Sequence, residues 1–464
     1  MNLRKMFIRY FVNPILWRFI KRSRRFAYLE ELRKKQWNGL QINKKKQAKK
    51  LYNLVKYAEN NIPYYRDIIR NKKISYSRKT IFQDIKKLPV LTKEDIDKNF
   101  DSLINKNIKS CTNTSGGSTG KQVTFLQTAH MYDYDAATTS LSKEWAGRKE
   151  GELIIKLWGS ERDALKGGSG WKGFLVRNFT NVILLNTYLM TEEDILNHIS
   201  TINKKRPKIL VAYADCAFEV AQFILDNNIK VYSPTAIITS AGTLFPKFRQ
   251  IIQQAFQCPV FDRYGSREVG GVAFECNKHN GLHVNIFNHY VEILDNKLRD
   301  VKKEGAKGEI YVTSLHNYAM PLIRYRIEDI GQVTNKKCAC GRGLPLIKKI
   351  EGRVGYTIRT KHSSVSSTAL TTTFYYPKSI KRYQVIQNKN NFLIKIEVRD
   401  KRQWQKDQKE LLLKLQKLLK GTKIEFRIVN KIHPTKSGKF LFFINENEIK
   451  QVKKNKMNYS PHQN

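Results

Sequence analysis

The stretch of the chain with the clearest chemical potential is TNTSGGSTGK, residues 112–121. It combines turn-forming glycines with hydroxyl groups and one cation, at Thr114, Ser115, Gly116, Gly117, Ser118, Thr119, Gly120 and Lys121. Glycines let backbone N–H groups approach an anion closely, and the hydroxyls and ammonium add donors. The stretch therefore predicts a phosphate-binding loop, although its spacing is not that of a Walker A motif. For the stretch taken alone, a flexible Ser/Gly loop is the alternative.

Four further motifs follow in order, each at a strand end or a glycine turn. They are TSAGTLFP at 239–246, DRYGSREVG at 262–270, RYRIEDIG at 324–331 and HPTKSGKF at 433–440. Each motif alone is a weak signal, but their order and spacing together are specific. They supply a carboxylate at Glu268, a second at Asp329 and an ammonium at Lys439.

The elements that must position these motifs alternate between apolar runs and helical patterns. ELIIKLWG, NVILLNT, KILVAYA, TAIITSAG and CPVFDRYG predict buried strands, and TEEDILNHISTINKK and FPKFRQIIQQAF predict helices between them. This alternation is typical of an α/β body with a largely parallel sheet, in which ligands bind where strands end. Residues 283–334 have a more β-like pattern and predict a separate antiparallel sheet. Residues 27–70 predict helices with a break at Pro63, and Thr92 predicts a helix N-cap.

The pattern becomes simpler after EGRVGY, residues 351–356, where KRYQVIQ, FLIKIEVRD, a long helix and KIEFRIV predict a small α+β domain. We therefore expect a basic N-terminal segment (1–26), a large ligand-binding domain (27–350), a hinge (351–356), a small C-terminal domain (357–451) and a polar tail (452–464).

With these motifs in view, the chain resembles the adenylate-forming enzymes, specifically their phenylacetate–coenzyme A ligase branch and, within it, the CapK-type proteins of capsular polysaccharide biosynthesis. KKQWNGLQ, NIPYYRD, ECNKHNGLHV, CACGR and KSGKF carry the same resemblance, which covers roughly residues 25–450. It implies a two-domain fold: a large N-terminal α/β domain with an antiparallel β subdomain, and a small α+β lid domain. It also implies the activity of an AMP-forming acid–thiol ligase.

The resemblance assigns roles to individual residues. Tyr264 resembles the aromatic that contacts adenine, Glu268 the Mg²⁺ ligand, and Asp329 the carboxylate that binds the ribose hydroxyls. The loop 114–121 would hold the β- and γ-phosphates of ATP. The remaining nucleotide contacts would come from Ser240, Ala241, Gly242, Asp262, Gly265, Ser266 and Arg353. Lys439 resembles the lysine that swings in with the small domain and contacts the carboxylate and α-phosphate. The structural alternatives are a surface salt bridge for Glu268, a surface-loop position for Asp329 and a solvated side chain for Lys439.

The sequence departs from the family pattern at two places. Val354 and Gly355 follow Arg353, where relatives usually have acidic residues, so the domain rotation before the second half-reaction is less secure. Ile327 and Glu328 stand where many relatives read Thr-Gly before the aspartate.

Cys276, His283, Cys338 and Cys340 have the ligand types of a tetrahedral Zn²⁺ site, with His279 as the alternative to His283. Some relatives in the branch carry a structural zinc near these positions. Reduced, partly buried thiols are the alternative.

The net charge of +45 predicts attraction to polyanions, although an AT-rich genome can also raise the lysine count. Residues 1–50 hold 16 Lys and Arg and two acids. We expect residues 1–26 to lie on an anionic membrane surface, or to pack on the body with a solvated basic face. No nucleic-acid-binding module is recognisable. The lack of a signal-peptide pattern favours a cytoplasmic protein, in reach of the inner face of the plasma membrane.

The sequence therefore predicts ATP- and Mg²⁺-dependent activation of a carboxylic acid, followed by transfer to coenzyme A. One alternative is an enzyme that passes the acyl group to another acceptor. Another is a non-catalytic assembly protein at the membrane. The aromatics Tyr132, Tyr134, Tyr213 and Phe218 are candidates for the acid pocket.

Overall fold

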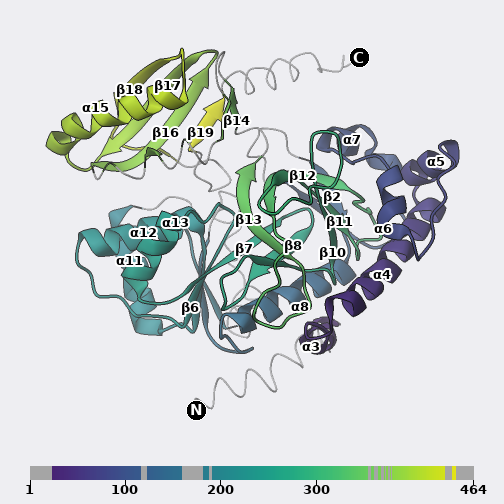
Figure 1. The fold of residues 1–464 in the computed structure, drawn as a ribbon. Coiled ribbons are helices and arrows are strands. Elements are labelled where there is room, and N and C mark those ends of the chain that lie inside the picture. Colours follow the sequence, from purple (N-terminus) through teal and green to yellow (C-terminus); the bar gives the residue numbers. More distant parts are fainter. Residues whose placement is uncertain are drawn as a thin grey trace, which may run out of the picture.

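The structure, a computed structural model, describes residues 23–115, 123–158, 181–187, 191–353, 357–359, 364–366, 370, 373–374, 377, 379–433 and 442–445. Within them lie a large domain and a smaller one above it in Figure 1. No helix in these ranges is long and apolar enough to cross a membrane.

The N-terminal helices form one edge of the large domain (Figure 1, purple). Pro63 ends one helix and occupies the first turn of the next, where its missing N–H costs nothing. Thr92 caps a helix through a reciprocal capping box with Asp95, as its sequence predicts. The elements are α3 (Arg25–Lys35), α4 (Leu40–Asn61), α5 (Pro63–Asn71), α6 (Ile81–Asp84), η3 (Ile85–Lys87), α7 (Lys93–Lys98) and η4 (Phe100–Ser102).

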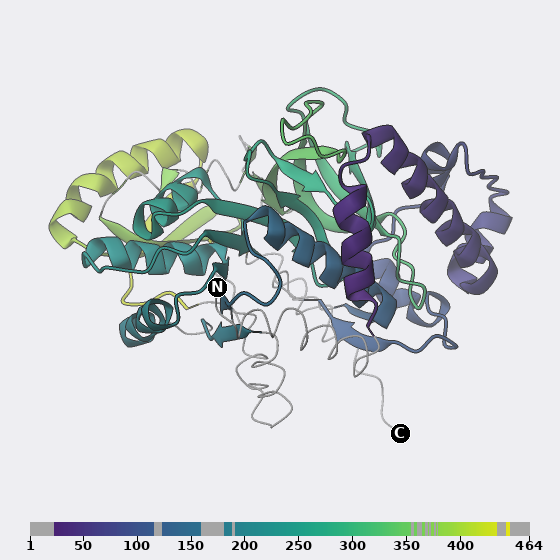
Figure 2. The same ribbon diagram turned by 90° about the horizontal axis from the view of Figure 1, so that it is seen from below.

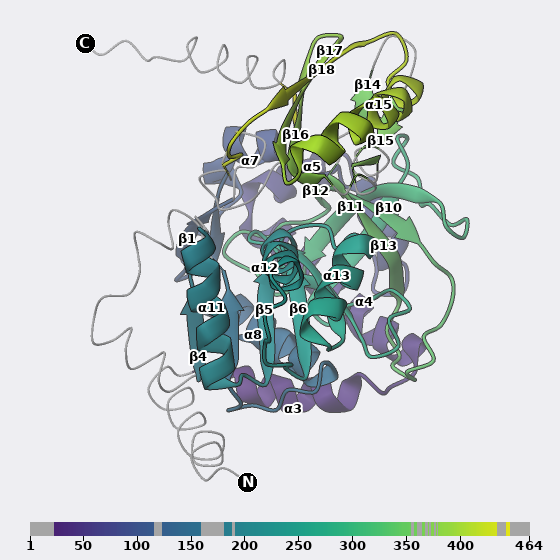
Figure 3. The same cartoon turned by 90° about the vertical axis from the view of Figure 1, so that its left-hand side faces the viewer.

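The five predicted strands and the two helices between them are all present, and four of the strands lie in parallel order β6-β5-β3-β4. The prediction that β4 is buried is wrong, because it is the edge strand of the sheet and Leu184 is exposed. Helices α11, α12 and α13 cover one face of this part of the sheet, and α8 lies on the other (Figures 2 and 3). The elements are α8 (Ala129–Trp145), β3 (Ile154–Leu157), β4 (Val182–Leu185), α11 (Glu192–Lys205), β5 (Ile209–Tyr213), α12 (Ala214–Asp226), β6 (Ala236–Ser240) and α13 (Pro246–Phe256).

The prediction of a separate antiparallel sheet is wrong. Strand β7 pairs in parallel with β6 on one side and antiparallel with β8 on the other, so both halves form one sheet of eleven strands. Sequence patterns give strand positions but not strand partners. The other strands of this half are β7 (Val260–Ser266), β8 (Gly270–Glu275), β9 (Leu282–Val284), β10 (His289–Leu294), β11 (Lys307–Ser314), β12 (Tyr325–Val333) and β13 (Leu346–Arg353).

The smaller domain has a four-stranded sheet whose apolar side is covered by one helix. It contacts α12 of the large domain through the ion pairs Arg382–Glu219 and Arg399–Asp226, and Phe442 packs against Phe248 of α13. Its elements are β16 (Ile380–Asn388), β17 (Asn391–Val398), α15 (Lys401–Leu418), β18 (Lys423–Ile428) and β19 (Phe443–Asn445), preceded by the hairpin β14 (Thr357–Arg359) and β15 (Ser364–Ser366). The domain and hinge boundaries expected from the sequence stay a prediction.

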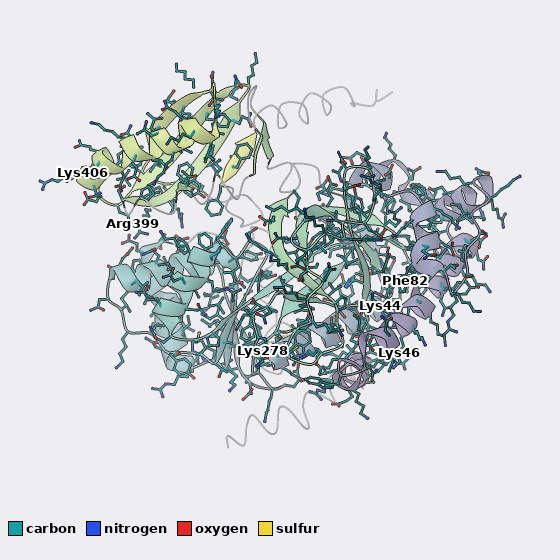
Figure 4. The ribbon with its side chains drawn as sticks, viewed as in Figure 1. Lys44, Lys46, Phe82, Lys278, Arg399 and Lys406 are labelled. Atoms are coloured by element: carbon teal, nitrogen blue, oxygen red, sulfur yellow. The ribbon has the colours of Figure 1, made fainter. Side chains whose placement is uncertain are left out.

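Part of the basic excess is solvent-exposed on the described surface. Lys44 and Lys46 on α4, Lys278 in the β8–β9 turn and Lys406 on α15 are all exposed (Figure 4). Of the N-terminal segment 1–26, the structure describes only residues 23–26, so the expected membrane contact stays a prediction.

Candidate active site and metal centre

The predicted phosphate loop is the turn of a β-hairpin formed by β1 (Cys111–Thr114) and β2 (Thr124–Gln127). Two hydrogen bonds close its base: the Ser115 N–H donates to the Val123 carbonyl, and the Ser115 Oγ accepts from the Val123 N–H, both at 2.9 Å. Ser115 is buried. Gly116–Lys121 lie outside the described residues, so the structure places the two ends of the loop.

Gln127, at the end of β2, ties this hairpin to the YGSRE segment. Its amide nitrogen donates to the backbone carbonyls of Arg267 and Glu268, at 2.8 and 3.3 Å. Its amide oxygen accepts hydrogen bonds from Tyr132 and Asn113. The proposed phosphate loop and Glu268 therefore lie on adjoining elements. Sequence reasoning missed Gln127, since no local pattern marks a side chain that acts through a partner 140 residues away.

Glu268 lies in the turn between β7 and β8 and is only 7% exposed. Its carboxylate has no ion-pair partner among the residues that the structure describes, which argues against the surface salt-bridge alternative. Nearby, the Ser266 Oγ is buried and has no hydrogen-bond partner in the described part of the chain. A buried polar atom without a partner is costly, so the Ser266 hydroxyl suits a polar ligand, and the adjacent Glu268 carboxylate is free of an ion pair with the described residues.

Tyr264 and Asp329 meet across the sheet, because the Tyr264 hydroxyl donates to the Asp329 carboxylate at 2.9 Å. Both residues lie at register shifts, Tyr264 between β7 and β8 and Asp329 between β11 and β12. Such bulges re-aim side chains and are common beside active sites. The structure thus brings together the residues expected to contact adenine and ribose.

The TSAGT turn follows β6, at the carboxyl end of a parallel strand. Ala241 has a positive φ of +64°. A Cβ built on Gly242 would lie 3.7 Å from the Ala214 Cβ, which is ordinary van der Waals contact. A Cβ on Gly352 would lie 3.5 Å from the Thr243 hydroxyl, so this turn lies against the end of β13. The backbone of Arg353 is paired in register with Asp329. Ser240 and the YGSRE strand are neighbours, because β6 pairs with β7.

Asp262 points to the opposite side of β7 from Arg263, toward α13. Its N–H donates to the Glu275 carboxylate, which also accepts two hydrogen bonds from Arg249. Burial and repulsion by Glu275 raise the pKa of Asp262 to about 7. Lys439 lies outside the described residues, and the roles expected of Asp262, Gly265 and Lys439 stay predictions.

The four predicted metal ligands converge. One ligand atom from each of Cys276, His283, Cys338 and Cys340 lies within 4.8 Å of all the others. The His283 Nε2 is 3.4 Å from both the Cys276 and Cys340 sulfurs. His279 instead contacts Glu275, so the structure favours His283 over the alternative histidine.

The chemistry of this cluster fits Zn²⁺. Burial and the nearby Arg342 lower the pKa of His283 to about 4, while a backbone contact with Leu344 acts in the opposite direction. The imidazole is therefore neutral at pH 7 and can offer a lone pair to a metal. Three sulfurs and one imidazole make a closed tetrahedral donor set, which is typical of structural zinc.

The loop that carries Cys338 and Cys340 also docks on the N-terminal helices. Arg342 lies over the rings of Trp37 and Trp145, at 4.8 and 4.6 Å, and its Nε donates to Gln36. The Gly343 N–H donates to the Gln36 carbonyl. A metal here would hold the β8–β9 and β12–β13 connections together beneath α3 and α8.

The comparisons with known proteins agree with this arrangement. The family model of the CapK C-terminal domain matches residues 357–446. Over 443 residues the chain is 29% identical to Protein CapK of Staphylococcus aureus, covering 92% of this chain and 94% of that protein. It is 22% identical to the phenylacetate-coenzyme A ligase of Thermus thermophilus, covering 76% and 80%. A crystal structure of 2-hydroxyisobutyryl-CoA ligase, in the postadenylation state with R3-HIB-AMP, superposes with a TM-score of 0.69 at 14% identity, covering 92% and 94%.

The chain is related to the adenylate-forming ligases and has their fold. The predicted relationship, fold and enzyme class, an AMP-forming ligase, are thereby confirmed. The individual site residues stay predictions, now supported by the contacts described above.

The structure explains one departure from the pattern of adenylate-forming ligases. Glu328 stands where many relatives have glycine, and its φ of +64° is a conformation that favours glycine. Its carboxylate forms an ion pair with Lys93, whose side chain is 7% exposed. The backbone of Leu91 bonds to Arg324 and Arg326 of the neighbouring segment and so brings Lys93 into reach. The ion pair offsets the strain.

Replacing Glu328 with glycine should destabilise the protein by about 1–4 kcal/mol. An unpaired, mostly buried Lys93 costs about 3–5 kcal/mol, and relief of the positive φ returns about 1–2 kcal/mol. Denaturant unfolding measures the difference. In the double variant with Lys93→Met, most of the loss should disappear; an equal loss in both variants would show that the ion pair is not its cause.

The four aromatics expected to shape an acid pocket have different partners in the structure. Phe218 stacks on Phe248, with ring centroids 4.1 Å apart, in the core between α12 and α13. Tyr134 stacks between Tyr28 and His316. Of the four, Tyr213 lies at the carboxyl end of a parallel strand and contacts Trp158 at 4.1 Å. Phe218 and Tyr134 are therefore engaged in other packing contacts, whereas Tyr132 stays beside the hairpin through its hydrogen bond to Gln127.

Proposed function

We propose that this ligase activates a carboxylic acid with MgATP to an acyl- or aryl-adenylate and then transfers the acyl group to a thiol, with coenzyme A as acceptor. The observation that carries this proposal is that Tyr264 of β7 hydrogen-bonds to Asp329 of β12, while buried Glu268, in the turn after β7, is tied to the Ser/Thr/Gly hairpin by Gln127. Adenylation joins two anionic reactants, so it depends on positioning and charge stabilisation, which such a constellation supplies.

Each residue then has a task that suits its chemistry. Asp329 accepts hydrogen bonds from the ribose hydroxyls, and Tyr264, hydrogen-bonded to it, presents its ring to adenine. Glu268 offers a hard oxygen ligand to Mg²⁺, which supplies charge neutralisation at the phosphates when bound. The N–H groups and hydroxyls of residues 114–121 hold the β- and γ-phosphates, and Lys439 places a cation at the reacting carboxylate and α-phosphate.

Lys439→Ala should lower ATP–pyrophosphate exchange by at least about 100-fold, since removing one donor to developing charge typically costs that much. Exchange is measured with a panel of aryl, short-chain, hydroxy and amino acids. Lys436→Ala, in the same segment, is the matched control and should retain activity. Full exchange in the Lys439 variant would contradict this mechanism.

Transfer to the acceptor requires its own test. The acidic residues that usually follow Arg353 are absent from the hinge, which turns the small domain before this second half-reaction. Release of AMP that requires coenzyme A would support the thiol acceptor. Release with an amine or hydroxyl compound in its place would favour an adenylating enzyme with another acceptor. The name of Protein CapK suggests a role in capsular polysaccharide biosynthesis as the setting of this activity.

We also propose that Cys276, His283, Cys338 and Cys340 hold a structural zinc ion. The cluster lies beyond the end of β8 opposite to Glu268. The chain from Gly270 to Cys276 is extended, and six residues at about 3.3 Å each give roughly 20 Å of separation. A site at that distance stabilises strands and takes no part in the reaction.

A further inference from the structure

A cluster of three basic side chains lies between α8 and the parallel strands, and the mechanism above does not use it. Its first member is Lys143 of α8. Thr139, Lys143 and Ala146 follow the i, i+4, i+7 spacing that places residues on one helix face. Ala146 packs with Ile154 and other residues of the underlying sheet. This face of α8 therefore points at the strands.

The second member is Lys156 of β3. Its neighbours Ile155 and Leu157 pack in the core beneath α11–α13, whereas Ile154 packs on the α8 side. Side chains alternate along a strand, so Lys156 faces α8 with Ile154. It is half-buried, and it has no hydrogen bond or ion pair with the described residues.

The third member is Arg263 of β7, which also faces α8. Its guanidinium donates to the Thr139 hydroxyl at 3.4 Å and lies 5.8 Å from the Phe274 ring centroid. Its Nε is buried and has no hydrogen-bond partner in the described part of the chain. Since Thr139 is one helical turn before Lys143, Arg263 lies close to Lys143.

The three cations repel one another. Burial, followed by repulsion from Lys156 and Arg148, lowers the pKa of Lys143 well below its usual value. Burial and repulsion from Arg263 lower the pKa of Lys156. Glu150 attracts Lys143, but its carboxylate is already 2.9 Å from Arg148 and 3.8 Å from Arg25.

The cluster adjoins the edge where the nucleotide is expected to bind. Arg263 immediately precedes Tyr264, and β7 lies beside β6, which ends at Ser240. Lys156 is two residues before Trp158, which contacts Tyr213 at the carboxyl end of β5. An acid whose carboxylate reaches the ATP site from between α8 and the strands would extend toward these three cations.

We propose that the acid substrate carries a second anionic group and that Lys143, Lys156 and Arg263 bind it. This inference rests on the proposed function. Partly buried basic groups that outnumber their counter-charges are costly to keep charged, and an anionic ligand compensates them through charge-assisted hydrogen bonds. The substrate class is therefore dicarboxylic acids and carboxylic acids that bear phosphate or sulfate.

The test uses the full chain and acids matched in length: glutarate against valerate, succinate against butyrate, and 3-phosphoglycerate against glycerate. We expect the dianionic member of at least one pair to give a kcat/KM for pyrophosphate exchange about 10²–10⁴-fold higher, because a site built for a polar group rejects the analogue that lacks it. Comparing the dicarboxylic acids with 3-phosphoglycerate shows whether the site prefers a second carboxylate or a phosphate. Lys156→Met should remove the preference, and Lys149→Met, an exposed neighbour of the cluster, should keep it.

Calorimetry without ATP separates this inference from the proposed function. If no acid supports exchange but a dianion binds to the native chain and not to Lys156→Met, the inference stands and the adenylation proposal fails. A preference for the monoanionic acids, or dianion binding that both Lys156→Met and Lys143→Gln leave unchanged, would overturn the inference. Unfolding temperatures equal to or above that of the native chain show that both variants fold.

Discussion

Replacing Glu268 with glutamine should lower ATP–pyrophosphate exchange by about 10²–10³-fold while leaving the fold intact. Metal coordination contributes several kcal/mol of charge stabilisation, and each 1.36 kcal/mol of barrier is tenfold in rate. Glutamine keeps the shape of the buried side chain but not its charge. The Mg²⁺ concentration that gives half-maximal exchange should rise, which a purely structural role for Glu268 would not cause.

The matched control for this experiment is Glu410→Gln. Glu410 is exposed on α15 and forms an i,i+4 ion pair with Lys414. Such pairs contribute little, so neither exchange nor Mg²⁺ dependence should change. Full activity of the Glu268 variant at limiting Mg²⁺ would show that another group holds the metal.

Cys276→Ser should release about one zinc ion per chain and lower the unfolding temperature by roughly 10 °C. A ligand present at about 1,000 times its Kd stabilises the folded chain by about 4 kcal/mol, and each kcal/mol shifts the midpoint of a domain this large by about 2–4 °C. Metal analysis of the purified chain and thermal unfolding with and without a chelator measure both effects. Catalysis by the remaining folded protein should persist, because the cluster lies away from Glu268.

Cys111→Ser provides the control, since Cys111 is exposed and outside the cluster. It should keep the metal and the unfolding temperature. If the purified native chain contains no metal and a chelator does not change its unfolding temperature, the three thiols and one imidazole of this cluster do not form a zinc site.

Local sequence patterns determined the positions of many strands and helices of this protein and several of its candidate site residues. The positions of strands β3, β4, β5, β6 and β7 follow from continuous apolar runs, although β4 is a partly exposed edge strand. The helix start at Thr92 follows from its side chain and a carboxylate three residues later. Order and spacing of motifs pointed to Tyr264, Glu268 and Asp329, and ligand types pointed to the cysteine–histidine cluster. In each case the residues that carry the signal are close in sequence or match a family pattern.

The tertiary structure decided what depends on partners far apart in the chain. Only strand pairing shows that β7 joins the parallel and antiparallel halves into one sheet, that Gln127 connects the hairpin to Glu268, and that Lys93 supports Glu328. The meeting of Lys143, Lys156 and Arg263 likewise needs α8 to lie across β3 and β7. Periodicity determines which face of an element a residue occupies. Which element packs against that face depends on the fold of the whole chain, because burying apolar surface is favourable whichever part of the chain covers it.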